Sequence, residues 1–278
     1  MNLQKKAEQL LALHHGDKML ILPNITTPMG ARILQDREFG AVATPSAGIA
    51  EQLGLQDGEI VPFEVLLFVL KQIVEATDLP VTADIERGYA ADLGHLKQNI
   101  SQLLNVGIVG VNVEDSLHEQ SEKQGLRDLA EQMKRIAAIR ASAEQQRVHL
   151  VINARIDVFV ACPKLSLDEK IATAIERAAA YKAAGADVIY PIGAKTETTI
   201  EQLLTAIDLP LNILALPDAL PLRKLEQMGV ARVSLGPFLY RATVGTMIEV
   251  IDAMQAYGDY GVFNDRIPKD GLGKFLKP

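Results

Sequence analysis

The sequence contains a single cysteine, Cys162, and no tryptophan among its 278 residues. One cysteine excludes an intramolecular disulfide and a metal site built from several thiolates, and it is typical of a reducing compartment. Aromatic residues make up only 5% of the chain, so a stacking platform for nucleotide bases is not indicated. We therefore expect a cytoplasmic protein whose chemistry depends on other side chains.

Long apolar runs and excess positive charge are also absent from the sequence. No stretch reaches the roughly 18 consecutive apolar residues of a transmembrane helix, and the first residues lack the apolar core of a signal peptide. The 28 basic and 35 acidic residues give a net charge of −7, which disfavours nucleic acids and anionic membranes as partners. We therefore expect a small-molecule ligand, and neither a nucleic-acid nor a membrane partner.

Short apolar runs typical of buried parallel strands recur along the chain. They lie at Met19–Leu22, Ala41–Ala43, Val81–Ile85, Gly110–Val113, His149–Ile152, Asp187–Tyr190, Asn212–Ala215 and Arg232–Leu235. Segments with helical periodicity separate them, among them Phe63–Ala76, His95–Asn105, Leu126–Ala143, Leu167–Ala184 and Leu222–Met228. Eight strand–helix units predict a (β/α)₈ TIM barrel. An open doubly wound sheet is the alternative, but the first strand lacks the glycine-rich phosphate turn of that fold.

No repeat or linker divides the chain, so we expect residues 1–278 to form one barrel domain. An extra N-terminal helix is predicted to end at Gly16, because apolar residues recur on one face of the preceding segment. Residues 242–278 are predicted to form a C-terminal helical extension. Its polar last part, from Tyr257 onward, is expected to be mobile or to wrap a neighbouring subunit.

Carboxylates gather where the third and fourth predicted strands end. Asp84 and Glu86 are two residues apart, which places them on one side of a strand, and Glu114 and Asp115 follow the next strand. Close carboxylates repel each other unless a cation or a proton lies between them. An all-oxygen cluster suits Mg²⁺, or Mn²⁺, better than zinc. The alternative is that these acids form structural ion pairs, with Arg32, Arg87 or Arg155 as partners.

The fifth strand ends in Arg155, followed by Asp157. A guanidinium beside the carboxylates would bind the carboxylate of an acidic substrate through two parallel hydrogen bonds. It would equally neutralise Glu114 or Asp84. Both roles stay open at this point.

The segment after the second strand carries Ser46, Ala47 and Gly48, whose small side chains would let backbone N–H groups approach an oxyanion. The alternative is a tight turn without a ligand. Asp57, further along the same segment, is interpreted either as a turn residue or as a carboxylate that supports the site. His118, Lys195 and Cys162 offer no recognisable nucleophile or base, and we expect them in ordinary loop positions.

Four motifs in order carry a family resemblance: SAGIA at Ser46, TADIERGY at Thr82, VEDS at Val113 and INARIDVF at Ile152. From Leu22 to Ala242 the chain resembles the isocitrate lyase/phosphoenolpyruvate mutase superfamily, in its phosphonomutase-like branch. The resemblance implies a TIM barrel, often a helix-exchanging homotetramer, with Mg²⁺ held partly through waters by Asp84, Glu86 and Glu114.

The resemblance also implies roles for residues around that metal. Asp57 would lie near it, residues 46–48 would bind a substrate carboxylate, and Arg155 would contact the substrate. The family binds a 2-oxo acid with its keto oxygen on the metal and breaks or forms a C–C or P–C bond through a pyruvate enolate. Arg155, Asp57 and Glu114 are therefore our predicted catalytic residues.

Two departures from the family pattern limit the assignment. Glu86 stands where well-known members carry Asp, and the segment Glu114–Gly125 lacks the cysteine-containing catalytic loop of isocitrate and methylisocitrate lyases. His118, Glu119 and Lys123 are candidates for a replacement acid or base, or are ordinary surface residues.

We therefore expect a Mg²⁺-dependent lyase or decarboxylase of a small 2-oxo or 2-hydroxy dicarboxylate such as oxaloacetate, in a dimer or tetramer. The alternatives are a phosphonopyruvate hydrolase or mutase and a 2-oxo acid binding protein without turnover.

Overall fold

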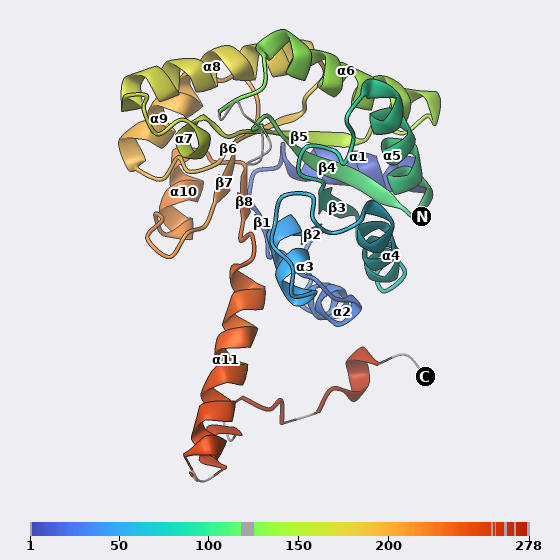
Figure 1. Cartoon of the computed structure of the whole chain (residues 1–278), viewed down its shortest axis with the longest axis vertical. Coiled ribbons are helices and arrows are strands. Elements are labelled where there is room, and N and C mark those ends of the chain that lie inside the picture. The colour runs from blue at the N-terminus through green and yellow to red at the C-terminus, as the bar shows by residue number, and fades with distance from the viewer. Residues whose placement is uncertain are drawn as a thin grey trace.

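The computed structural model describes residues 2–117, 125–256, 258, 260–263, 266–269 and 271–276. Eight parallel strands form two curled sheets of a TIM-barrel-like fold (Figure 1). The strands are β1 (Leu20–Leu22), β2 (Val42–Thr44), β3 (Val81–Asp84), β4 (Ile108–Glu114), β5 (Val151–Ile156), β6 (Val188–Pro191), β7 (Asn212–Leu214) and β8 (Arg232–Ser234). One sheet has the order β2-β3-β4-β5-β6 and the other β1-β8-β7. Single bridges, Asn24 to Ala43 and Ile189 to Leu211, join their edges.

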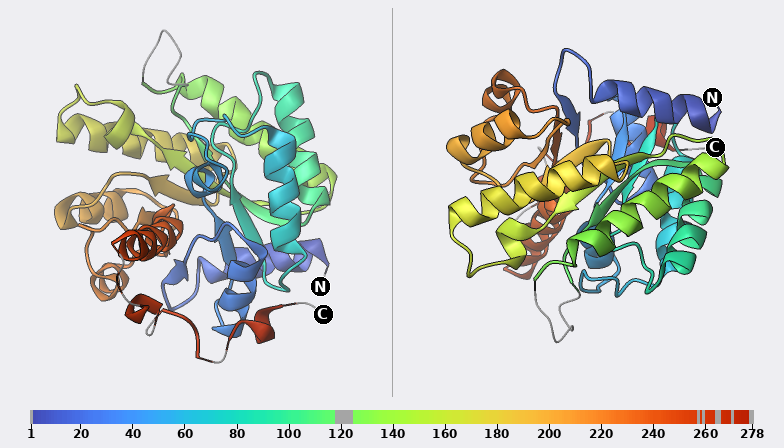
Figure 2. Two further views of the ribbon diagram at one scale, coloured as in Figure 1. Left: turned by 60° about the horizontal axis from the view of Figure 1, so that its bottom comes forward. Right: turned by 90° about the horizontal axis from the view of Figure 1, so that it is seen from above.

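Helices connect the strands and cover the outside of the sheet (Figure 2). They are α1 (Leu3–Leu13), α2 (Pro28–Asp36), α3 (Ser46–Gln52), α4 (Phe63–Val74), α5 (Leu93–Asn105), α6 (Leu129–Gln145), α7 (Val158–Ala161), α8 (Leu167–Ala183), α9 (Glu197–Ala206), α10 (Leu222–Met228) and α11 (Phe238–Gln255). No helix in these ranges is long and apolar enough to cross a membrane.

The bounds of seven predicted strands lie within two residues of the observed ones, and β5 differs more. This strand was expected at His149–Ile152 and instead runs over Val151–Ile156. At this end of β5 the Asp187 side chain accepts hydrogen bonds from the His149 ring (2.7 Å), before the strand, and from the Ile152 N–H (2.8 Å), within it. The shift places Arg155 inside the strand, where it is paired in register with Glu114 of β4.

The C-terminal extension begins four residues earlier than predicted, at Phe238, and α11 projects away from the barrel (Figure 1). None of the side chains described in α11 is buried. The tail then returns to its own chain: Phe275 is buried, its carbonyl accepts a hydrogen bond from Arg32, and Lys274 pairs with Asp36 at 2.9 Å. These described parts of the tail therefore pack on α2.

Polar side chains occupy the interior between β4, β5, β7 and β8, where barrels usually carry branched apolar residues. Asn153 donates to Asn112 at 2.8 Å, and Ser234 receives a hydrogen bond from Arg232 (3.1 Å) while it donates to Asn212 (3.0 Å). These buried contacts tie strands together beneath the carboxylates of β3 and β4.

Helix α1 packs against β4, and His14 caps its C-terminus. An added Cβ at Gly110 would lie 2.7 Å from Leu10, so a glycine is required for this close approach. The buried His14 ring donates from Nδ1 to the Leu10 carbonyl (2.8 Å), and its Nε2 has no hydrogen-bond partner. Burial, together with the positive charge of Arg232, lowers the pKa of His14 to about 3.

This lowered pKa predicts a loss of stability in mild acid. Between pH 6.5 and about 3 the unfolded chain binds a proton at His14 that the folded chain excludes, so stability falls as the pH falls through this range. From pH 7.5 to 5.5 the histidine should remove about 1.4 kcal/mol of unfolding free energy. Urea unfolding of wild type, His14→Met and, as a control at the exposed neighbour, His15→Met will measure it. Equal pH dependence in all three would contradict the prediction.

Candidate active site

A cavity of about 610 Å³ opens where β3, β4 and β5 end. Four of the predicted site residues line it together: Asp57, Glu86, Glu114 and Arg155. Its remaining lining is Gly58, Arg87, Ser116, Leu117, Gly125, Asp157, Val160, Ala161 and Pro163. Chain segments far apart in the sequence therefore converge on one hollow, as the barrel prediction requires.

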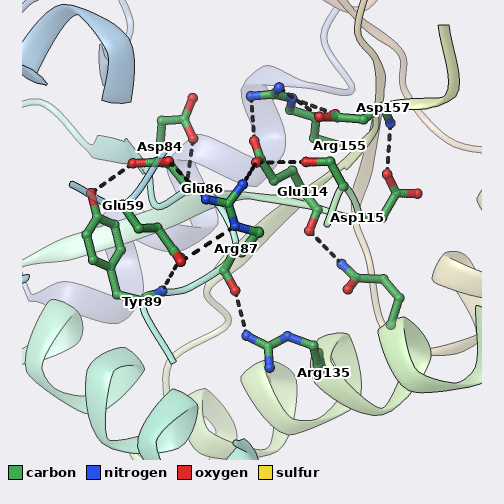
Figure 3. A network of polar contacts seen from close by, with 12 residues as sticks. Glu59, Asp84, Glu86, Arg87, Tyr89, Glu114, Asp115, Arg135, Arg155 and Asp157 are labelled. Atoms are coloured by element: carbon green, nitrogen blue, oxygen red, sulfur yellow. Dashed lines mark hydrogen bonds and ion pairs between the residues drawn. The ribbon is translucent and has the colours of Figure 1, made fainter. Parts of the chain in front are cut away.

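Both oxygens of the Glu114 carboxylate are engaged by cations (Figure 3). Arg155 Nη1 lies 2.7 Å from Oε2, and Arg87 Nη1 lies 3.1 Å from Oε1, which also accepts a hydrogen bond from Ser116 at 2.9 Å. For this acid the ion-pair alternative is therefore observed. Arg32, considered as a partner as well, lies elsewhere and contacts the Phe275 carbonyl.

Arg155 is held in a fixed orientation by Asp157. Its Nε and Nη2 donate to the two carboxylate oxygens at 2.7 and 2.9 Å, while Nη1 points to Glu114. Asp157 is fixed in turn, because its backbone N–H donates to Asp115 at 2.8 Å. The guanidinium therefore cannot reorient without breaking several buried contacts.

Asp115 belongs to this support and does not line the cavity. Its fully buried carboxylate accepts hydrogen bonds from Tyr181 (2.7 Å) and Arg177 (3.1 Å) of α8. The sequence analysis grouped Asp115 with the acids suited to a metal ion. The structure corrects this grouping, because the Asp115 carboxylate binds side chains of α8 instead.

The acids around the cavity are short of positive charge. Burial, and then the neighbouring Asp57 carboxylate, raises the pKa of Glu86 to about 8. Burial also raises the pKa of Asp84 to about 6, although Arg155 opposes the shift, and it raises the pKa of Asp57 together with the charge of Glu114. The described lining of the cavity holds four carboxylates, Asp57, Glu86, Glu114 and Asp157, and two arginines, Arg87 and Arg155, so negative charge is in excess there.

Asp84 lies at the end of β3, where it accepts a hydrogen bond from the Glu86 N–H at 3.1 Å. Within the described parts of the chain, no group of three or more His, Cys, Asp or Glu side chains is arranged to hold a metal ion. The reason is visible at Glu114, which is turned to arginines, and at Glu86, which accepts from the Tyr89 hydroxyl at 2.9 Å. The assignment of Asp84, Glu86 and Glu114 as metal-binding residues stays a prediction.

Ser46, Ala47 and Gly48 form the first turn of α3 and are not part of the described lining of the cavity. Pro45 precedes them and offers no side-chain cap, so the first N–H groups of the helix have no side-chain partner at that residue. The Ser46 side chain lowers the pKa of Asp57, against the effect of burial, so this turn interacts with a residue that lines the cavity. The predicted base candidates His118, Glu119 and Lys123 lie outside the described residues.

The loop after β3 has a conformation that the sequence did not indicate. Glu86, Gly88 and Tyr89 have φ angles of 50°, 97° and 52°, a region that non-glycine residues rarely adopt. Buried Arg135 of α6 holds the loop by donating to the carbonyls of Arg87 (2.6 Å) and Ala90 (3.1 Å). Only Gly88 gave a local signal for this turn.

Comparison with known proteins gives this fold a family. Residues 10–255 match the phosphoenolpyruvate phosphomutase family. A candidate 2-methylisocitrate lyase 2 of Corynebacterium glutamicum is 28% identical over 255 residues, which cover 89% of this chain and 79% of that protein. An oxaloacetate decarboxylase of Rhodopseudomonas palustris is 31% identical over 176 residues, 63% of this chain and 58% of its own.

A similar solved structure is that of a candidate phosphonomutase from Burkholderia cenocepacia J2315. It superimposes with a TM-score of 0.84 at 35% sequence identity and covers 89% of this chain and 99% of its own.

Arg135 should be essential to the loop after β3. Arg135→Met would leave the buried carbonyl of Arg87 and the half-buried carbonyl of Ala90 without these donors, at a cost of about 3 kcal/mol in unfolding free energy. Lys134→Met, an equal change of charge at the exposed neighbour on α6, should cost less than about 0.5 kcal/mol. Urea unfolding of both variants tests this, and equal losses would show that Arg135 has no special role.

Proposed function

Because the chain belongs to the phosphoenolpyruvate mutase/isocitrate lyase superfamily, whose members are lyases and mutases, we propose that it is a metal-dependent lyase or decarboxylase. The proposed substrate is a small 2-oxo or 2-hydroxy dicarboxylate, with oxaloacetate as the first to test. One observation carries this proposal: an orientated arginine, Arg155, shares a cavity with carboxylates that lack sufficient counter-charge.

The donor set fits a hard divalent cation, Mg²⁺ or Mn²⁺. The groups are all carboxylates, and the raised pKa values of Asp84 and Glu86 reflect burial and repulsion between carboxylates, which a cation would relieve. Asp84 would hold the ion, and Glu86 and Glu114 would hold its waters. When bound, such an ion supplies a Lewis acid that draws electrons from the keto group of the substrate.

Arg155 would stabilise the negative charge that develops when the C–C bond of the substrate breaks. Because Asp157 and Glu114 fix the guanidinium in advance, little reorganisation is needed at the moment of reaction. Asp57, with its raised pKa, is a candidate to hold or transfer a proton at its carboxyl group. The N–H groups at Ser46, Ala47 and Gly48 would bind a substrate carboxylate at the start of α3.

Two other functions are supported by single observations. The similarity to a candidate phosphonomutase favours a P–C bond enzyme, a phosphonopyruvate hydrolase or mutase. The engagement of both Glu114 oxygens by arginines favours a 2-oxo acid binding protein without turnover.

Product release distinguishes these functions. Purified protein with Mg²⁺ should release pyruvate from oxaloacetate above the metal-only background, and Asp84→Asn should lower the rate at least about 100-fold because the ion loses its direct ligand. Asp78→Asn, an equal charge change at an exposed residue before β3, is the control and should keep the wild-type rate.

The same assay should include phosphonopyruvate. Pyruvate from phosphonopyruvate alone would favour the P–C bond enzyme. Thermal stabilisation by oxo acids without any product would contradict an enzyme and favour the binding protein.

We also propose that α11 packs against a second copy of the chain. Its exposed apolar side chains, Met247, Ile248, Ile251 and Met254, recur at helical spacing along one face, and each is more than half exposed. A projecting helix with such a face is stabilised by burial in an oligomer. The proposed assembly is a dimer or tetramer. A cytoplasmic location is proposed separately, because a single cysteine is typical of a reducing compartment.

Ile251→Glu should therefore lower the molar mass in light scattering after size exclusion, because a carboxylate would be buried in the apolar contact. Ala242→Glu adds the same charge near the opposite face of the exposed helix and should leave the mass unchanged. A wild-type monomer would contradict the proposal directly.

A further inference from the structure

Arg87 lies between three carboxylates at the wall of the cavity (Figure 3). Its Nη1 is 3.1 Å from Glu114, its Nε 3.6 Å from Glu59, and its Nη2 3.8 Å from Glu86. Only 9% of the side chain is exposed. The guanidinium is therefore a second buried cation, beside Arg155, among the acids of the site.

The hydrogen bonding of this guanidinium is incomplete. The contact with Glu114 is a hydrogen bond, but Nε and Nη2 have no hydrogen-bond partner and only approach Glu59 and Glu86 at ion-pair distance. A buried guanidinium with unused donors is costly unless its charge is needed where it lies. The loop therefore holds the Arg87 guanidinium among the carboxylates, although two of its three nitrogens make no hydrogen bond there.

Several contacts keep Arg87 from withdrawing. Arg135 donates to its carbonyl at 2.6 Å, and Asn99 donates to the carbonyls of Gly88 (3.1 Å) and Tyr89 (2.9 Å). An added Cβ at Gly88 would lie 2.5 Å from Leu96, so the turn also packs tightly against α5. The surrounding structure therefore imposes the rare backbone conformation of this loop.

Glu86 and Glu114 are also the acids to which we assign the waters of a divalent cation, so the next step rests on the proposed function. We infer that Arg87 is a built-in cation that competes with the divalent ion for these two carboxylates and thereby sets the metal affinity. A positive charge 3–4 Å from both acids lowers their attraction for a second cation. Arg87 is thus a positioning residue: it lowers the affinity of the site for the metal ion, and without metal it pairs with Glu86 and Glu114.

Binding of Mn²⁺ to the full-length protein, followed by electron paramagnetic resonance of the free ion, tests this inference without relying on activity. Arg87→Gln removes the charge and can keep a hydrogen bond to Glu114, so it should bind Mn²⁺ about tenfold or more tightly than wild type. Arg87→Lys keeps the charge and should stay within about threefold of wild type. Arg37→Met removes one charge from a side chain that is 67% exposed, and should leave the affinity unchanged.

The direction of the change decides the inference. Unchanged or weaker Mn²⁺ binding by Arg87→Gln, with a wild type that binds, would overturn it and leave the proposed metal site intact. If neither protein binds Mn²⁺, both the inference and the metal part of the proposed function fail. If Arg87→Gln is too unstable for the titration, the second measurement is the rise in Tm that Mn²⁺ causes in each protein. A rise for Arg87→Gln no larger than that for wild type would equally overturn the inference.

Discussion

The constraint on which this structure depends is a surplus of buried negative charge at the ends of β3 and β4. Burial and neighbouring carboxylates raise the pKa values of Asp84 and Glu86, and the charges of Asp57 and Glu114 lie close to both. Much of the nearby architecture compensates this charge. The same surplus is the basis of the proposed cation site.

Two supports lie behind the cavity, one for each arginine. Helix α8 holds Asp115, which fixes the backbone of Asp157 and through it the guanidinium of Arg155. Helix α6 holds the loop after β3 through Arg135 and so fixes Arg87. Because each support is buried and charged, loss of either helix contact would disturb an arginine that lines the cavity.

How much the sequence could predict depended on how local each signal is. The strand positions follow from apolar runs, and β5 differs most because it continues through the polar residues Asn153 and Arg155, which an apolar run does not include. The gathering of Glu86, Glu114 and Arg155 followed from the rule that parallel strands end at one edge, whereas the place of Asp57 beside them followed only from the family resemblance. Asp115 was misplaced, because its neighbours in the sequence line the cavity while its own partners come from α8.

By itself, therefore, the sequence determined the alternation of strands and helices, the family and the identity of the acids and of Arg155, since these depend on residue order and type. Only the tertiary structure decided which carboxylate meets which cation. Glu114 pairs with two arginines, and Arg87 enters the acid cluster from a loop whose unusual φ angles depend on Arg135 and Asn99. Such pairings are long-range and buried, so they depend on the packing of helices that no local pattern specifies.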